Sequence, residues 1–405
     1  MLEVCDFPEG RKMAKVKPEL KVMEGSRAVA EAVKACRPDV ICAYPITPQT
    51  HIVAELANIV ANGELKTEYV NADSEFSAAS IVLGASAAGA RAFTSSSSQG
   101  ILLMNEVLYN IAGMRLPVVL SCANRAISAP LNIWNDHQDS FSVRDSGWIQ
   151  LYAESNQEAA DMHIQAFKIA EDHRVLLPVM VCMDGFLITH TYEPVEVFNQ
   201  DEVDRFLPPY DPPYVLDPKK PLTFGSFAEP DKYMETRYIL HHTLEKAQEV
   251  VEEVARDFGE TFSRFQGGLI DTYATEDASI IIVAMGSVLA TMKEAVDKMR
   301  NEGQKVGVLK VRTFRPFPKE AIYEALKGAE KVAVVEKAIS LGYGGILGPE
   351  IRSVFYGKEK RPQIANFIAG LGGREITTDT IFKIVEKTEE KSPELEFVDL
   401  RREIL

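Results

Sequence analysis

Four polar segments of the sequence contain residues whose types and spacing could carry chemistry. Each follows or ends a stretch predicted to be a strand. Two of them begin where an apolar strand ends, which is where open α/β sheets bind their ligands. The four segments are YPITPQT (44–50), NADSEFSAAS (71–80), TSSSSQG (94–100) and ANRAISAPLNIWNDHQDS (123–140).

The first two segments offer a hydroxyl and a carboxylate. Two prolines restrict the backbone around Thr47, so its hydroxyl could be held in place at low entropic cost. The alternative is an ordinary strand-to-helix turn with Pro48 near the helix start. Glu75 is expected in the first turn of a helix, where a carboxylate can simply interact with the helix dipole. It could instead hydrogen-bond a nitrogen heterocycle in a partly buried cleft.

The other two segments offer hydroxyls and a guanidinium. TSSSSQG lies between a strand and a helix and suits a polar pocket wall better than a phosphate site, because no Walker A sequence follows. Arg125 could clamp a carboxylate through two parallel hydrogen bonds, or form an ion pair with Asp136 or Asp139.

Adjacent Asn, Asp and His side chains in NDHQD point in different directions, so we predict no metal site in the chain.

Composition narrows the class of protein. The net charge of −15 argues against a nucleic-acid partner, which would require clustered Lys and Arg. No stretch approaches the roughly 18 consecutive apolar residues of a membrane span, and the first residues do not resemble a secretory signal. We therefore expect a cytoplasmic protein without membrane contact. The five cysteines are scattered without a CxxC pair, so we expect no iron-sulfur cluster on this chain.

Elements that position these residues alternate between strand and helix. Strands that are apolar on both faces predict a parallel sheet covered by helices on two sides. The expected organisation is described by residue ranges: an N-terminal extension (1–25), a doubly wound α/β domain (26–195), a proline-rich connector with a long helix (196–275), a second α/β domain (276–390) and a C-terminal tail (391–405). We expect the long helix over about 233–265. The glycine-rich GYGGILG (342–348) is not a GxGxxG pattern and favours a tight turn.

Over about residues 24–390 the chain resembles the alpha subunits of the pyruvate:ferredoxin oxidoreductase family, within the 2-oxoacid:ferredoxin oxidoreductases. YPITPQT is the most specific piece of this resemblance. The other pieces follow in the expected order: SSQGILLMNEVLYNIAGMRLPVV, NRAISAPLNIWNDHQDS, RVLLPVMVCMDGFLITHT, FLPPY and FRPFP. The resemblance implies a thiamine-diphosphate-binding domain of the pyrimidine type, followed by an α/β domain like the C-terminal domain of transketolase.

The resemblance also implies roles for individual residues. Glu75 matches the catalytic glutamate that hydrogen-bonds N1′ of the pyrimidine and favours the tautomer that removes the thiazolium C2 proton. Thr47 and Arg125 match residues that hold the substrate carboxylate. Further contacts with the cofactor are expected from Pro45, Ile46, Ser98 and Gln99.

The implied activity is the oxidative decarboxylation of a 2-oxoacid, most simply pyruvate, with coenzyme A as acyl acceptor and ferredoxin as electron acceptor. The resemblance also implies a beta subunit that holds the diphosphate and Mg²⁺, and ferredoxin-like gamma and delta subunits that carry the iron-sulfur clusters. The absence of a GDG…NN motif from this chain agrees with that division. Three alternatives remain open at this point: a 2-oxoisovalerate enzyme, a 2-oxoglutarate enzyme, or a non-catalytic subunit kept for assembly.

Overall fold

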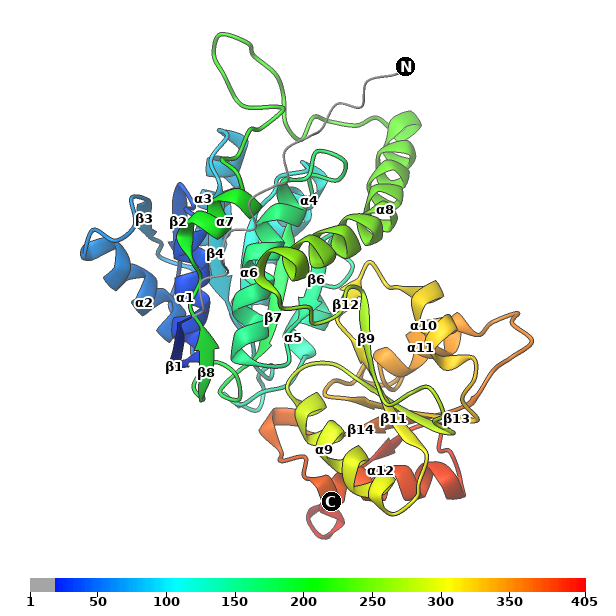
Figure 1. Cartoon of the computed structure of the whole chain (residues 1–405). Helices are drawn as coiled ribbons and strands as arrows, with labels where there is room; N and C mark the ends of the chain where they lie inside the picture. Colours follow the sequence, from blue (N-terminus) through cyan, green and yellow to red (C-terminus); the bar gives the residue numbers. More distant parts are fainter. Residues whose placement is uncertain (1–18) are drawn as a thin grey trace, which may run out of the picture.

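The computed structural model describes residues 19–405, which build two α/β bodies lying side by side (Figure 1). Each body is organised around its own large sheet, and a two-stranded sheet lies at the edge of the first body. No helix within residues 19–405 combines the length and apolarity needed to cross a bilayer.

The first body contains a seven-stranded sheet of order β12-β6-β7-β5-β4-β2-β3. All its neighbouring strands are parallel except β12, which runs antiparallel to β6. The strands are β2 (Val40–Ala43), β3 (Glu68–Asn71), β4 (Ala92–Ser96), β5 (Val119–Asn124), β6 (Ile149–Tyr152), β7 (Val179–Asp184) and β12 (Thr313–Arg315).

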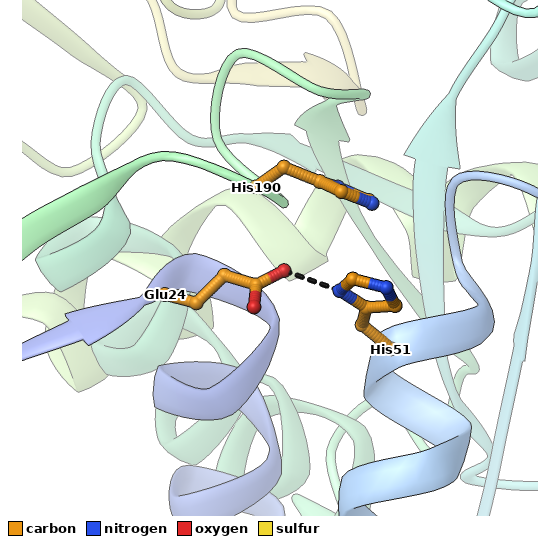
Figure 2. Close-up of side chains that lie close together, drawn as sticks. All are labelled: Glu24, His51 and His190. Atoms are coloured by element: carbon orange, nitrogen blue, oxygen red, sulfur yellow. Dashed lines mark hydrogen bonds and ion pairs between the residues drawn. The ribbon is translucent and has the colours of Figure 1, made fainter.

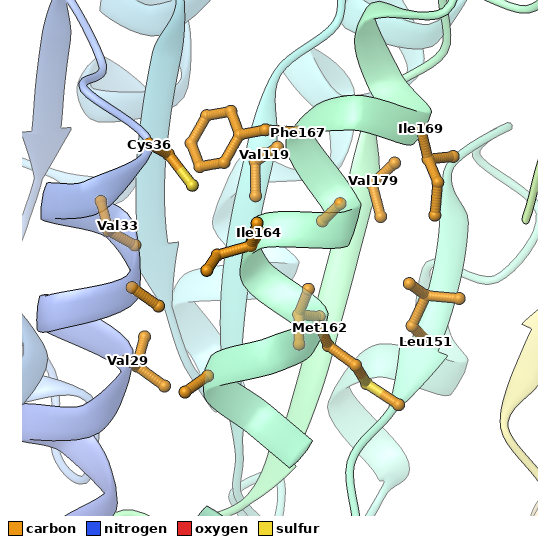
Figure 3. Close-up of a cluster of buried hydrophobic side chains, with 14 of the residues drawn as sticks. Val29, Val33, Cys36, Val119, Leu151, Met162, Ile164, Phe167, Ile169 and Val179 are labelled. Atoms are coloured by element: carbon orange, nitrogen blue, oxygen red, sulfur yellow. The ribbon is translucent and has the colours of Figure 1, made fainter. Parts of the chain in front are cut away.

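Helices cover both faces of this sheet, so the doubly wound arrangement expected from the sequence is confirmed. Consecutive residues of β5 point into separate cores: Val119 belongs to one hydrophobic cluster and Leu120 to the other. On one face α1 and α6 pack on each other and on the sheet, with Val29 of α1 and Phe167 of α6 in their shared core (Figure 3). On the other face α3 packs against α4. The helices of this body are α1 (Gly25–Ala35), α2 (Thr50–Ala61), α3 (Glu75–Ala87), α4 (Ser98–Gly113), α5 (Gln138–Ser142) and α6 (Asn156–Glu171).

Two segments that the sequence pattern assigned to an extension and a connector contain regular structure. β1 (Leu20–Glu24) pairs antiparallel with β8 (Tyr192–Glu196), so the last part of the 1–25 segment is docked. The connector begins with α7 (Gln200–Phe206) and then runs along the first body, where the amide of Leu216 donates to the carbonyl of Ala87.

The long helix α8 (Pro230–Phe262) begins and ends three residues before the range expected from the sequence. Proline is favourable in the first turn, because its missing N–H would have had no partner inside the helix. The helix ends at Phe262 because Ser263 adopts a left-handed conformation with φ of 59°. Its second half packs on α6 in the first body.

The second body contains a six-stranded sheet of order β15-β14-β13-β10-β11-β9. Only β9 runs antiparallel to its neighbour. The strands are β9 (Ile270–Tyr273), β10 (Ile280–Ala284), β11 (Val306–Val311), β13 (Lys331–Glu336), β14 (Gln363–Ile368) and β15 (Glu396–Phe397). The helices are α9 (Val288–Asn301), α10 (Lys319–Leu326), α11 (Leu347–Val354) and α12 (Thr378–Glu390), with short 3₁₀ turns η1 (Leu371–Gly373) and η2 (Arg402–Ile404).

The glycine-rich loop before α11 wraps around a carboxylate of the protein itself. Glu336, at the end of β13, accepts hydrogen bonds from the amides of Ile346, Leu347 and Gly348 at 2.7, 2.7 and 3.1 Å. A Cβ atom at Gly345 would lie 2.0 Å from a Glu336 oxygen, which explains the glycine there. The Glu336 carboxylate therefore occupies the amides at the start of α11. This agrees with a tight turn and not with a dinucleotide-binding loop, whose amides would have to be available to a phosphate.

Candidate functional site

The four chemistry-bearing segments meet at one edge of the first sheet. Strands β5, β4, β2 and β3 are consecutive neighbours and run parallel, so their carboxyl ends lie along the same edge. The segment 44–50 follows β2, Glu75 follows β3, Ser98 follows β4 and Arg125 follows β5. This is the edge at which open α/β sheets form their ligand crevice.

A buried glutamine anchors the 44–50 loop to the neighbouring strand. The side-chain amide of Gln49 donates to the carbonyl of Ser95 at 2.9 Å, and its oxygen accepts from the amide of Ile46 at 3.2 Å. Pro45 and Thr47 are exposed, and Ile46 is half-buried. These three residues therefore face outward from a loop that is anchored to β4.

Arg125 and Thr47 are brought into direct contact. The guanidinium Nη1 of Arg125 donates to the Thr47 carbonyl at 2.9 Å, and its Nε donates to the carbonyl of Asn132 at 3.1 Å. Within the described residues no carboxylate pairs with this guanidinium, so the predicted alternative of an ion pair with Asp136 or Asp139 is wrong. Burial lowers the pKa of Arg125, an effect that the charge of Asp139 partly offsets. A cation without a carboxylate partner at this edge can receive an anionic ligand.

Glu75 is a buried carboxylate that no other described residue hydrogen-bonds. It is the first residue of α3, which is capped by the hydroxyl of Ser74 accepting from the amide of Ser77 at 3.2 Å. Only 7% of Glu75 is exposed. The buried hydroxyl of Ser96 nearby also has no hydrogen-bond partner within residues 19–405. A buried charge without a partner is costly, so this arrangement is suited to a polar ligand that supplies the missing hydrogen bond.

Gly100 in the first turn of α4 makes room for that carboxylate. A Cβ atom at this position would lie 2.7 Å from Glu75 Oε1 and 2.4 Å from Ser96 Oγ. Gly100 ends the TSSSSQG segment, but nothing in the local sequence pattern indicated its contact with Glu75.

Ser98 and Gln99 are turned toward the loop that carries Arg125. The Ser98 hydroxyl lies 2.5 Å from both the carbonyl of Ala126 and the side-chain oxygen of Gln99. The Gln99 amide donates to the Ser128 carbonyl at 3.5 Å. Both residues therefore hold protein groups together, and contact with a cofactor remains a prediction for them.

Asp139, which sequence reasoning considered only as a partner for Arg125, organises this edge. One of its oxygens accepts from the amides of Ser98 and Arg125, each at 2.9 Å, and the other accepts from the Asn124 side chain and the Ser140 amide, each at 2.8 Å. Burial raises the pKa of Asp139, and these hydrogen bonds oppose the rise. The only signal in the sequence was a carboxylate within a segment that also contains Arg125.

The remaining acid and the histidine of NDHQD contact separate partners. Asp136 accepts from the amides of Gln138 and Gly372, and His137 contacts Asp184 of β7 at 2.7 Å. Their side chains are engaged in different directions, as the sequence analysis expected.

Two protein families match the chain. Residues 31–256 match the family described as pyruvate flavodoxin/ferredoxin oxidoreductase, thiamine-diphosphate-binding. Residues 278–381 match pyruvate:ferredoxin oxidoreductase core domain II.

Curated relatives cover nearly the whole chain. Pyruvate synthase subunit PorA of Methanosarcina barkeri is 51% identical, over 96% of this chain and 98% of the relative. PorA of Pyrococcus horikoshii is 47% identical over 96% of this chain and 100% of the relative. Ketoisovalerate oxidoreductase subunit VorA of Pyrococcus abyssi is 44% identical over 92% of this chain and 94% of the relative.

A solved structure shares the fold. It is a 2-oxoglutarate:ferredoxin oxidoreductase from Magnetococcus marinus, with 2-oxoglutarate, coenzyme A and succinyl-CoA bound. The TM-score is 0.69 at 18% identity, over 94% of this chain and 68% of that chain.

Proposed function

The chain belongs to the pyruvate flavodoxin/ferredoxin oxidoreductase family, and we propose that it is the alpha subunit of a pyruvate:ferredoxin oxidoreductase that holds the pyrimidine ring of thiamine diphosphate. The unpartnered, buried carboxylate of Glu75 is the observation that carries this proposal. The relatives called PorA, matched over nearly their full length, support the choice of reaction. We place the pyrimidine-binding domain at 26–195 and the transketolase C-terminal-like domain at 276–390.

The edge of the first sheet fits the proposed cofactor in its polar groups. Bound thiamine diphosphate would supply an electron sink for the decarboxylation of a 2-oxoacid. Glu75 would hydrogen-bond a ring nitrogen and hold or release the proton at that atom. The exposed Pro45 and the half-buried Ile46 would form a wall beside the ring, and Ser98 and Gln99 would provide further contacts.

Arg125 and Thr47 would position the substrate. The guanidinium would pair with the substrate carboxylate, using donors that the Thr47 and Asn132 carbonyls do not occupy. The exposed hydroxyl of Thr47 would donate a further hydrogen bond. Both residues would act by orientation and charge complementarity, because their contacts hold the reacting carbon in place without exchanging atoms with it.

The overall reaction would convert pyruvate and coenzyme A to acetyl-CoA and CO₂, with two electrons passed to ferredoxin. Partner chains would complete the enzyme: a beta subunit with the diphosphate and Mg²⁺, and gamma and delta subunits with iron-sulfur clusters. The scattered cysteines support this division, because Cys36, Cys42, Cys122 and Cys182 are buried free thiols. We propose that the complex acts in the cytoplasm.

The decisive experiment replaces the carboxylate in the assembled complex. Glu75→Gln keeps the shape of the side chain but cannot exchange a proton with the ring, so pyruvate-dependent ferredoxin reduction should fall by roughly two to four orders of magnitude. The matched control is Glu302→Gln at the exposed end of α9, which should leave the rate unchanged. Normal turnover by an assembled Glu75→Gln complex would overturn the proposal.

The substrate is tested with the same complex. Rates with pyruvate, 2-oxoisovalerate and 2-oxoglutarate should rank pyruvate first by kcat/KM, and a different rank would assign the chain to another branch.

The alternative of a non-catalytic assembly subunit predicts full activity in Arg125→Met. We expect that variant to raise KM for pyruvate strongly, and Arg125→Lys to recover part of the loss because it restores the charge without the fork.

A further inference from the structure

Two histidines and a glutamate from three separate segments meet beside the first body (Figure 2). Glu24 is the last residue of β1, His51 lies in the first turn of α2, and His190 lies in the loop before β8. The pairing of β1 with β8 brings Glu24 close to His190, and the 44–50 loop leads directly into the helix turn with His51. None of the three takes part in the proposed reaction.

The ligand-type atoms of these side chains converge. One carboxylate oxygen and one nitrogen from each ring all lie within 4.8 Å of one another. His51 Nδ1 is 2.5 Å from Glu24 Oε1, and the two imidazoles stack with centroids 4.3 Å apart. The side chain of His51 is 49% exposed, so an ion could reach the cluster from solvent.

The orientation of His190 is fixed by a second residue. Its Nδ1 lies 2.7 Å from the hydroxyl of the fully buried Thr189, which in turn accepts from the amide of Phe186 at 2.8 Å. When Nδ1 donates to that hydroxyl, Nε2 keeps its lone pair, and it has no partner among residues 19–405. A ring nitrogen held in this way by a neighbouring oxygen is the usual arrangement around a metal-binding histidine.

The charges of the cluster also suit a cation. Burial and the neighbouring His51 lower the pKa of His190, and Glu24 opposes this effect. A metal cation bound by one nitrogen lone pair of each ring and by the Glu24 carboxylate would be attracted by all three side chains.

We propose that Glu24, His51 and His190 form a binding site for a divalent transition-metal ion of the Zn²⁺ type. Two imidazoles and one carboxylate are a preferred ligand set for such ions, with water completing the coordination. Metal–nitrogen distances of about 2.0–2.1 Å require the ligand atoms to approach by roughly 1 Å, which rotation of the exposed His51 ring can provide. The bound ion would tie β1, α2 and the 185–191 loop together next to the 44–50 loop.

The test measures zinc binding to the full chain without an affinity tag. Cys5 lies outside the described residues, so all proteins carry Cys5→Ser to remove its thiol as a competing ligand. Zn²⁺ is titrated at neutral pH in competition with a chromophoric chelator, and Tm is measured with and without Zn²⁺. We expect one equivalent to bind and to raise Tm.

The variants decide which residues hold the ion. His51→Ala, His190→Ala and Glu24→Gln should each weaken binding by roughly tenfold or more and remove the rise in Tm. His173→Ala is the matched control, because this exposed histidine contacts the Asp211 carbonyl outside the cluster, and it should bind zinc as the parent does. His51 is exposed enough that its replacement should leave the fold intact, which circular dichroism checks. Absence of stoichiometric binding, or equal binding by the three variants and the parent, would overturn the proposal.

Discussion

At the residue scale, the position of Arg125 depends on a side chain that contacts only its backbone. Asp139 accepts hydrogen bonds from four N–H donors, namely the side chain of Asn124 and the amides of Ser98, Arg125 and Ser140. The guanidinium is then free to donate to Thr47. A buried carboxylate with four donors is therefore a positioning group for the residues that would meet the substrate.

Replacing this carboxylate by an amide should be costly. In Asp139→Asn one oxygen becomes an NH₂ group, so one pair of buried donors loses its acceptor. We expect the free energy of unfolding of the full chain to fall by about 2–4 kcal/mol, measured by urea denaturation. The control is Asp145→Asn, at an exposed carboxylate, which should change the free energy of unfolding by less than about 0.5 kcal/mol. Equal stability of the two variants would show that the hydrogen bonds to Asp139 are dispensable.

A buried histidine should make stability depend on pH. His163 lies 2.6 Å from the Ala159 carbonyl and 2.9 Å from the Ser121 hydroxyl, and burial lowers its pKa from 6.5 to about 4. The folded state favours the neutral form of His163. Its contribution to the free energy of unfolding is therefore fully present above pH 6.5 and is lost as the pH falls toward 4. This lowering of the His163 pKa corresponds to about 3 kcal/mol in the free energy of unfolding. Urea unfolding should show a smaller decline in stability over this range for His163→Gln than for the parent, whereas His173→Gln should decline as the parent does.

At the element scale, the approach of α4 to α3 leaves no room for a side chain at Gly100. In Gly100→Ala the new methyl group would displace the Glu75 carboxylate or the Ser96 hydroxyl. Alanine is otherwise the better helix former by about 1 kcal/mol, so loss of function here would come from the site and not from the helix. We expect pyruvate-dependent ferredoxin reduction by the complex to fall at least tenfold.

The same helix provides the control for this prediction. Gly113 ends α4, and a Cβ atom there would meet no atom of the described part of the chain within 4 Å. Gly113→Ala should therefore retain full activity and keep or slightly raise Tm. If both alanine variants were equally active, the close approach of Gly100 to Glu75 would have no functional importance.

The elements also show what the sequence could and could not predict. The alternation of strands and helices was sufficient to predict a doubly wound sheet. Glu75, Ser98 and Arg125 each follow a strand, but the sequence could not show that these strands are neighbours, so their shared edge became evident only from the strand order. Local patterns do not encode partners that are distant in the chain. The positioning role of Asp139 was missed because two of its donors, Ser98 and Asn124, are distant from it in the chain. The three-residue strand β12 was missed because its pairing with β6 arises from contact between the two bodies.

At the scale of the whole molecule, the two bodies are joined by shared structure and not by the connector alone. The chain leaves the second sheet at the end of β11 and enters the first sheet as β12 after one residue. Buried charges reinforce this junction: Lys310, on β11, pairs with Glu158 of α6 at 2.6 Å. Reorientation of one body relative to the other would have to break both contacts, so we expect them to move as one unit.

A second buried charge cluster between the bodies surrounds Asp184. Asp184 ends β7, and it accepts from the ammonium of Lys337 at 2.6 Å and from the hydroxyl and amide of Ser287 in the second body. Burial alone would raise the pKa of Asp184, but the charges of Lys337 and His137 hold it well below its usual range. Removal of the lysine would therefore leave an ionised carboxylate in the interface without its main counter-charge.

Lys337→Met should lower the free energy of unfolding by about 3–5 kcal/mol, because breaking a buried ion pair exposes the full cost of the remaining charge. Lys298→Met is the matched control: its pair with Glu294 is 50% exposed on the lysine side and should contribute less than about 0.5 kcal/mol. Adding Asp184→Asn to Lys337→Met should cost less than the sum of the two single changes, since it removes the stranded charge. Urea denaturation of the four proteins measures these differences. Strict additivity would mean that Asp184 and Lys337 do not interact, which would contradict the prediction.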